Sequence, residues 1–326
     1  MKVTFISLSL ILGMLSAVPA GSAGRPPQVG VLSPFASAAV SSPPFEAFRT
    51  ALRDLGYVEG RTIQFVYRWA DGNRERLAGF ADELVRLKVD VLFAAPGTPT
   101  VMAAQKATAT IPIIFVGVGD VVGVGIVERL AHPGGNATGL VNESEDIAGK
   151  QLEMLTETVP RLARVGVLWR PSNPSYKNLM HRFDEVVRAR AVRVVPLAAE
   201  TPEDLVSAFQ TIKQKRIQGL VVQADELFIR EGQRIVDLAA ASRVPAIYRL
   251  SDQAALGGLM AYGPHIPEMY RRAASYIDKV LRGTKPADLP VEQPTRFEFV
   301  VNLKTAKALG LAIPPSILIR ADRVIQ

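Results

Sequence analysis

The sequence predicts an α/β protein built from two doubly wound parallel-sheet lobes joined by a multi-segment hinge. Short apolar strands alternate with amphipathic helices at intervals of about 25 to 30 residues, the length of one strand plus its crossover helix. The strands are continuous runs of Val, Ile and Leu, which is typical of parallel strands covered by helices on both faces. Ten such strands in a chain of 326 residues exceed what one hydrophobic core comfortably holds, so two sheets are expected.

Each expected strand is a short apolar run bounded by turn residues. Their bounds, in chain order, are 29–33, 62–67, 89–94, 113–116, 137–141, 165–169, 192–196, 219–222, 244–247 and 258–261. After the second strand, Asp71 and Gly72 form a turn, and Asn73 is expected to begin a helix whose apolar stripe runs from Leu77 to Leu87.

Later helices also carry recognisable ends. An apolar stripe over 147–159 predicts a helix between the two halves of the chain. Thr201 with Asp204 three residues later is typical of a capping box. The last helix is expected over 302–309, with Gly310 at its C-cap position.

The two lobes are expected to be discontinuous in sequence. Residues 24–145 and 263–284 are assigned to the first lobe, and residues 146–262 and 285–326 to the second. The first boundary falls at the helix that leads from the first five strands to the second five. The prolines that follow Gly283 indicate a strap that crosses back over the joint.

The first 23 residues are expected to be a secretory signal peptide. Lys2 precedes an uncharged run over 3–18, followed by small residues, with cleavage expected after Ala20 or Ala23. The apolar run is shorter than the roughly 20 residues that a membrane-spanning helix needs. The mature chain is therefore expected in the periplasm, with no stable membrane insertion after cleavage.

Composition excludes several classes of protein. The chain has no cysteine, which excludes disulfide scaffolds, thiolate metal sites, iron–sulfur clusters, thiol catalysis and a lipoprotein anchor. The formal charge of +7 comes from Lys and Arg scattered along the chain, without a basic run that interleaves aromatics, so no nucleic-acid partner is expected.

The sequence contains no motif that predicts catalysis, a cofactor or a metal site. The glycine-rich segment 117–123 departs from the dinucleotide-binding pattern at Val122, where the third glycine would stand. His132, His181 and His265 show no metal-ligand spacing, and no nucleophile-elbow or phosphate-loop motif occurs. We expect no cofactor and no catalytic residue, although an exported enzyme of Rossmann-like fold stays an alternative.

Polar side chains recur at the carboxyl ends of the expected strands, where open α/β sheets bind ligands. In the first half these are Ser33, Thr98, Thr100, Asp120 and Asn142, with Pro99 between the two threonines as a further candidate, and in the second half Asn173, Tyr176, Asp225 and Tyr248. Each alone could cap a helix or form a turn, but their recurrence at the same end of both halves predicts a ligand-binding cleft.

Five stretches resemble one family, the bacterial ABC-transporter substrate-binding proteins that include tryptophan-binding members. They are LGYVEG at 55–60, YRWADG at 67–72, HPGGNATG at 132–139, KPADLP at 285–290 and VNLKTAKALGL at 301–311. The likeness covers essentially the whole mature chain in order. It implies a type I periplasmic binding protein that holds a small solute in its cleft and delivers it to an ABC-transporter permease in the inner membrane. An exported sensor that presents its ligand to a receptor is the alternative.

The resemblance also implies roles for single residues. The family's Thr-Pro after the third strand matches Thr98 and Pro99, and its Asp-Pro after the fourth matches Asp120, where Val121 replaces the proline. The acidic position at the rim of the second lobe matches Asp225, and the segment after 165–169 contributes Asn173.

These side chains suit an amino acid or a small aromatic acid. The helix N-terminus at Thr98 would donate hydrogen bonds to a ligand carboxylate. Asp120 or Asp225 would pair with an amine, and Tyr176, Tyr248 or Trp169 would cover an apolar body. Ligand contacts with both lobes would then favour closure of the hinge.

Overall fold

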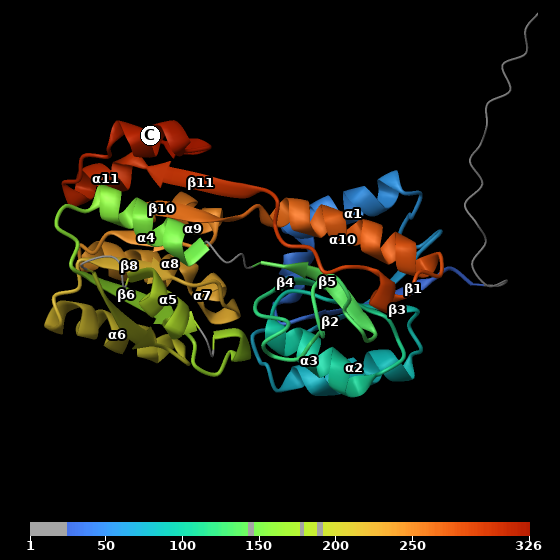
Figure 1. Cartoon of the computed structure of the whole chain (residues 1–326). Helices are drawn as coiled ribbons and strands as arrows, with labels where there is room; N and C mark the ends of the chain where they lie inside the picture. Colours follow the sequence, from blue (N-terminus) through green and yellow to red (C-terminus); the bar gives the residue numbers. More distant parts are fainter. Residues whose placement is uncertain (1–24, 143–146, 177–178, 188–191) are drawn as a thin grey trace, which may run out of the picture.

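The computed structural model describes residues 25–142, 147–176, 179–187 and 192–326. The expected signal peptide, residues 1–23, lies outside them. In the described part of the chain, no helix is both long and apolar enough to cross a bilayer. Two lobes stand side by side, each a sheet with helices on both faces (Figure 1). The predicted fold class is confirmed.

The first lobe is a parallel sheet of five strands in the order β2-β1-β3-β4-β5. Helices α1 and α10 cover one face and α2 and α3 the other. The elements are β1 (Gln28–Ser33), the short helix η1 (Ser37–Ser41), α1 (Pro43–Asp54), β2 (Gln64–Trp69), α2 (Arg76–Arg86), β3 (Val91–Ala94), α3 (Thr98–Ala107), β4 (Ile113–Val118), β5 (Ala137–Val141), α10 (Ile266–Leu281) and η3 (Pro286–Asp288).

The second lobe is a sheet of seven strands in the order β12-β11-β10-β9-β8-β6-β7, in which only the pairing of β11 with β10 is antiparallel. Helices α6 to α9 cover one face, and α4, α5, α11 and α12 the other. The elements are α4 (Ile147–Thr158), β6 (Arg164–Trp169), η2 (Pro174–Tyr176), α5 (Leu179–Val187), β7 (Arg193–Ala198), α6 (Pro202–Gln214), β8 (Gly219–Val222), α7 (Glu226–Arg230), α8 (Gly232–Ala241), β9 (Ala246–Tyr248), α9 (Ser251–Ala255), β10 (Met260–Pro264), β11 (Phe297–Asn302), α11 (Leu303–Leu309), α12 (Pro315–Arg320) and β12 (Arg323–Ile325).

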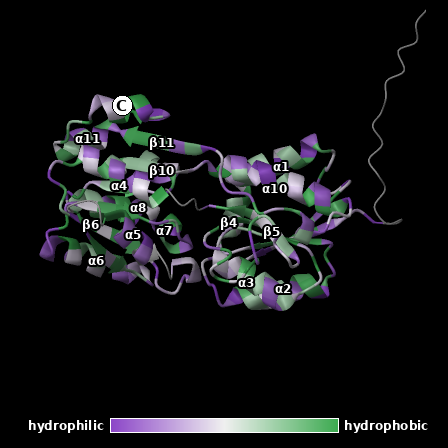
Figure 2. Ribbon diagram, in the orientation of Figure 1, coloured by the Kyte–Doolittle hydropathy of each residue, from purple (hydrophilic) through white to green (hydrophobic). Residues whose placement is uncertain are grey.

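Apolar side chains are buried where the helices meet the sheets. Every residue of β3 and of β8 is buried, as expected for central parallel strands. The helices mix hydrophilic and hydrophobic residues, whereas hydrophobic residues predominate in the strands at the centre of each lobe (Figure 2). Each lobe therefore has its own core, and the two lobes meet through a separate set of contacts.

The chain passes between the lobes three times: from β5 to α4, from β10 to α10 and from η3 to β11. The third passage begins after Glu292, whereas the sequence-based division placed it at residue 285. Residues 286–292 lie on the first lobe because they cover the open edge of β5. The Val141 amide donates to the Glu292 carbonyl at 3.0 Å, and the Thr138 hydroxyl donates to the Leu289 carbonyl at 2.6 Å.

The ten expected strands are present, with ends shifted by up to three residues, and β11 and β12 were not expected. The capping box at Thr201 is confirmed, as is Gly310 in the left-handed conformation after α11. Two helix predictions were wrong. Helix α2 begins at Arg76, because the Asn73 side chain forms a turn with the Glu75 amide (3.0 Å), and α12 follows the helix that was expected to be last.

Candidate ligand-binding site

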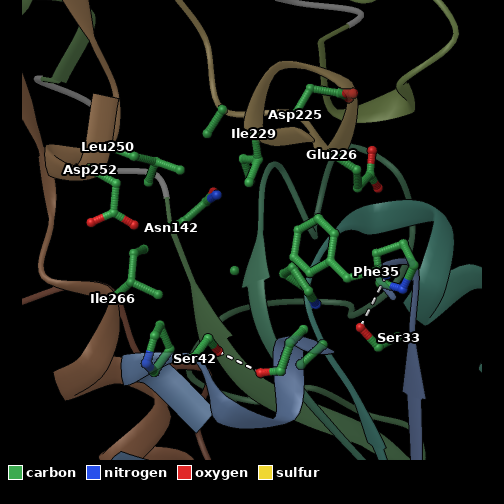
Figure 3. A pocket seen from close by; sticks show the side chains of 18 of the residues that line it. Ser33, Phe35, Ser42, Asn142, Asp225, Glu226, Ile229, Leu250, Asp252 and Ile266 are labelled. Atoms are coloured by element: carbon green, nitrogen blue, oxygen red, sulfur yellow. Dashed lines mark hydrogen bonds between the residues drawn. The ribbon is translucent and has the colours of Figure 1, made fainter. Parts of the chain in front are cut away.

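A cavity of about 600 Å³ lies between the carboxyl ends of the two sheets (Figure 3). Parallel strands leave this end of a sheet open, and the helices that follow them point their N-terminal amides toward it. The beginnings of α1, α3, α7, α9 and α10 all contribute lining residues. The cavity therefore has walls from both lobes and from the chain segments that join them.

The first lobe supplies an aromatic wall, which we define as Phe35, Phe45, Trp69 and Tyr270. Trp69 ends β2 in register with Ser33 at the end of β1, and its ring meets Phe45 edge-on at a centroid distance of 6.1 Å. Trp169 was expected in this role from the sequence, and Trp69 was not. The signal was present, because Trp69 lies at the carboxyl end of a strand next to Ser33.

The lobes meet at the start of α3. The hydroxyls of Thr98 and Ser175 form a hydrogen bond between the lobes, and both residues are buried. Gly97 precedes the helix with φ of 96°, a conformation that L side chains rarely adopt. A Cβ at position 97 would also lie 2.7 Å from Oε1 of Glu226. Glycine here allows the second lobe to approach the helix N-terminus closely.

Beside this contact is an inter-lobe ion cluster, which we define as Arg74, Arg170, Asp225 and Glu226. Nη2 of Arg74, from the first lobe, lies 3.0 Å from Oδ2 of Asp225 and also donates to Oε2 of Glu226. Nη1 of Arg170 lies 3.4 Å from Oδ1 of Asp225. In this cluster the positive charge of Arg74 on the first lobe faces the negative charges of Asp225 and Glu226 on the second, so the two lobes attract each other where they meet.

Asp225 is held on every side. Its Oδ1 accepts from the Leu227 amide at 2.9 Å, which caps α7, and its Oδ2 accepts from Nδ2 of Asn173 at 2.8 Å. With the two arginines, these contacts occupy a carboxylate whose side chain has no exposed surface. Asp225 therefore stabilises the structure of the site, and its oxygen atoms have no position left for a hydrogen bond from a ligand.

Glu226 differs from its neighbour. The residue is only 7% exposed, and its Oε1 has no hydrogen-bond partner among the residues that the structure describes. Burial and the adjacent carboxylate of Asp225 raise the pKa of Glu226 to about 7, while Arg74 opposes this shift. Sequence reasoning missed Glu226, because an acid in the first turn of a helix is usually solvated.

Six of the ten residues predicted from the sequence line the cavity: Ser33, Thr98, Asn142, Asn173, Tyr176 and Asp225. The Tyr176 hydroxyl donates to the Ala224 carbonyl, which fixes the ring beneath the start of α7. The Asn142 carbonyl accepts from Nη2 of Arg249 at 2.7 Å, where the chain leaves the first lobe. The structure thus brings residues from both halves of the chain together.

The other four predicted residues lie outside the lining. Pro99 and Thr100 belong to the first turn of α3, and the Thr100 hydroxyl donates to the Pro96 carbonyl at 2.9 Å. Asp120 accepts from the Gly123 amide at 2.9 Å in the turn after β4. Tyr248 is fully buried in the core of the second lobe. These side chains satisfy local structure instead of facing the cavity.

Within the described ranges, no group of three His, Cys, Asp or Glu side chains is placed to hold a metal ion. The one histidine in the cavity lining, His265, caps α10, where its Nδ1 accepts from the Glu268 amide at 3.3 Å. The site offers apolar surface, helix N-termini, the buried Oε1 of Glu226 that has no partner among the described residues, and the carboxylates of Asp71, Asp252 and Glu298. This is the chemistry of binding a small polar molecule.

The fold is that of the type I periplasmic binding proteins. Its defining features are two α/β lobes with mainly parallel sheets, three connecting segments, and a cavity between the carboxyl ends of both sheets. A sequence model of one family, described as ABC transporter substrate binding protein, matches residues 30–325. The chain belongs to this family, as the resemblance had indicated.

Several characterised relatives are similar to this chain. A tyrosine-binding protein of Clostridioides difficile (strain R20291) is 27% identical over 266 residues, which cover 82% of this chain and 76% of that protein. A solved domain from Streptococcus pneumonia in complex with L-Trp is 24% identical, with a TM-score of 0.85 over 92% of this chain and 100% of that chain. The ligand-free, open structure of a Clostridium difficile substrate-binding protein with adhesive properties is 25% identical, with a TM-score of 0.68 over 92% of this chain and 99% of that one.

Proposed function

We propose that this protein is the exported solute-binding component of an ABC importer, and that it captures an aromatic amino acid between its lobes. One observation carries the proposal. The cavity has the aromatic wall on one side and polar groups on another, namely the start of α3 and the unpartnered oxygen of Glu226. An aromatic amino acid has the same two parts. The relatives that are named for tyrosine or solved with L-Trp support this ligand class.

The two parts of the ligand would meet two different parts of the first lobe, the start of α3 and the aromatic wall. The Thr98 amide at the start of α3 would donate to the carboxylate, since an unpaired amide and the helix dipole favour an anion. The Thr98 hydroxyl could donate as well while its oxygen accepts from Ser175. The ring would lie against Trp69 and Phe45, where aromatic rings in contact stabilise by about 0.5–1.5 kcal/mol beyond burial. The cavity walls from the second lobe would complete the enclosure.

Capture would then work by closure of the lobes. Contacts with both lobes exist together only in a closed arrangement, so the ligand shifts the equilibrium by its difference in affinity for the two states. At nearly equal identity, this chain matches the open, ligand-free structure less well (TM-score 0.68) than the L-Trp complex (0.85), which supports lobes that stand close together here. The closed protein would deliver its ligand to a permease from the periplasm.

The direct test is calorimetry and thermal unfolding of the purified protein with L-tyrosine, L-tryptophan and L-leucine. A bound ligand at 100 times its dissociation constant stabilises the folded state by about 2.7 kcal/mol, which is easily detected. An aromatic amino acid is expected to give the largest shift. A shift confined to L-leucine, or the absence of a shift with all three, would reject the proposed ligand class.

Replacing Trp69 by alanine is expected to weaken binding of L-tyrosine by about tenfold or more, because the ring loses its apolar contact surface in the aromatic wall. Titration calorimetry measures the change. Phe80→Ala is the matched control, since Phe80 lies on α2 away from the cavity lining and stacks with Arg76 instead. If both variants bind L-tyrosine equally weakly, Trp69 does not contact the ligand.

A further inference from the structure

We infer that Glu226 is the residue that makes this site selective for ligands carrying an ammonium group, and that Asp225 is not. The inference rests on the proposed function and deepens it, since it assigns the recognition of the ligand amine to one oxygen atom. Three observations lead to it: the occupied state of Asp225, the free Oε1 of Glu226, and the position of that oxygen beside α3.

The first observation removes the obvious candidate. Asp225 already accepts hydrogen bonds from the Leu227 amide and the Asn173 side chain and pairs with Arg74 and Arg170. A carboxylate has about four lone-pair positions, and these contacts use them. A ligand ammonium could reach Asp225 only by displacing one of its partners.

The second observation is an acceptor without a donor. Oε2 of Glu226 accepts from Arg74, but Oε1 has no partner in the part of the chain that the structure describes. A buried acceptor that lacks a partner destabilises the protein, and more so when it is charged, so a ligand that donates to it recovers that free energy. Figure 3 shows Glu226 on the same side of the cavity as Phe35.

The third observation concerns distance between the two ends of a ligand. Oε1 of Glu226 lies 2.7 Å from the place where a Cβ on Gly97 would be, so it sits directly at the residue that precedes α3. The first amide of an α-helix has no partner within the helix, which in α3 is the amide of Thr98, because position 99 is proline and the Thr100 amide donates to the Gly97 carbonyl at 3.2 Å. A donor for a carboxylate and an acceptor for an ammonium are therefore adjacent, as the two charged groups are in an α-amino acid, where one carbon carries both.

The test compares three probes on the wild-type protein and on Glu226→Gln. L-tyrosine carries both groups, 3-(4-hydroxyphenyl)propionate lacks the amine, and tyramine lacks the carboxylate. Titration calorimetry of the wild type is expected to show at least tenfold tighter binding of L-tyrosine than of the propionate. In Glu226→Gln this preference is expected to fall to about threefold or less, because L-tyrosine weakens and the propionate does not.

Glu231→Gln is the matched control, since Glu231 follows α7 outside the cavity lining and pairs with Arg230 and Arg234. It is expected to keep the full preference. A wild type that binds none of the three probes would reject the proposed function together with this inference. A wild type that binds L-tyrosine, with an undiminished preference in Glu226→Gln, would overturn the inference alone.

A pH series on the wild type tests the same assignment without a substitution. The pKa of Glu226 near 7 results from burial and Asp225, which raise it, and Arg74, which lowers it. A bound ammonium favours ionised Glu226, so the preference for L-tyrosine over the propionate is expected to grow at least threefold from pH 6 to pH 8. His265, Asp71, Asp252 and Glu298 also line the cavity, so Glu226→Gln is measured over the same pH range and is expected to lose the dependence. A preference that is flat with pH would contradict the assignment.

Discussion

The double variant Thr98→Cys/Ser175→Cys is expected to exchange L-tyrosine at least tenfold more slowly when oxidised than when reduced. The two hydroxyls meet across the line between the lobes, so cysteines at these positions bring their sulfur atoms within bonding reach. A disulfide here would hold the lobes closed, and the ligand would have to enter and leave without their separation. The chain has no other cysteine, which makes the oxidation unambiguous.

Stopped-flow fluorescence before and after reduction measures the exchange, and solution scattering measures the shape. The oxidised protein is expected to keep one radius of gyration with and without ligand, whereas the reduced protein contracts when ligand is added. Each single cysteine variant controls for the loss of the inter-lobe hydrogen bond. Equal exchange rates in the oxidised and reduced proteins would show that the ligand does not depend on lobe opening.

Most of the fold follows from the sequence because parallel strands leave a strong signal. The runs at 91–94 and 219–222 are apolar without interruption, as burial on both faces requires, and both became central strands. The two missed strands carry a weaker signal. In β11 the continuous apolar run is only the three residues 299–301, between Glu298 and Asn302, and β12 has only three residues at the edge of its sheet. The third passage between the lobes was misplaced because residues 286–292 are held by the edge of a distant strand.

The candidate site was predictable in position but less so in its side chains. The rule that ligands bind at the carboxyl ends of strands correctly selected Ser33 and Thr98 as lining residues. It does not tell whether a polar residue at that edge faces the cavity or satisfies a local turn, as Asp120 does. It also cannot distinguish Asp225 from Glu226, because the difference lies in which oxygen atoms already have partners.

Replacing Asp225 by alanine is expected to lower the free energy of unfolding by about 3 kcal/mol. The substitution removes the cap of α7, leaves the Asn173 amide without its acceptor, and takes one partner from Arg74 and one from Arg170. A lost cap costs about 1 kcal/mol, and a hydrogen bond to a buried charge about 1.5–3 kcal/mol. Both arginines keep a second carboxylate, Glu226 and Glu200, which limits the loss.

Urea unfolding followed by circular dichroism measures this change, with Asp54→Ala as the control. Asp54 ends α1 in solvent, and its nearest cation, Arg271, is 4.0 Å away, so its removal is expected to change stability by no more than about 0.5 kcal/mol. Asp225→Asn keeps an acceptor for the Leu227 amide and is expected to lose less than alanine does. A stable Asp225→Ala protein that no longer binds L-tyrosine would mean that Asp225 contacts the ligand directly. A destabilised one that still binds it would leave Glu226 as the acid that faces the ligand.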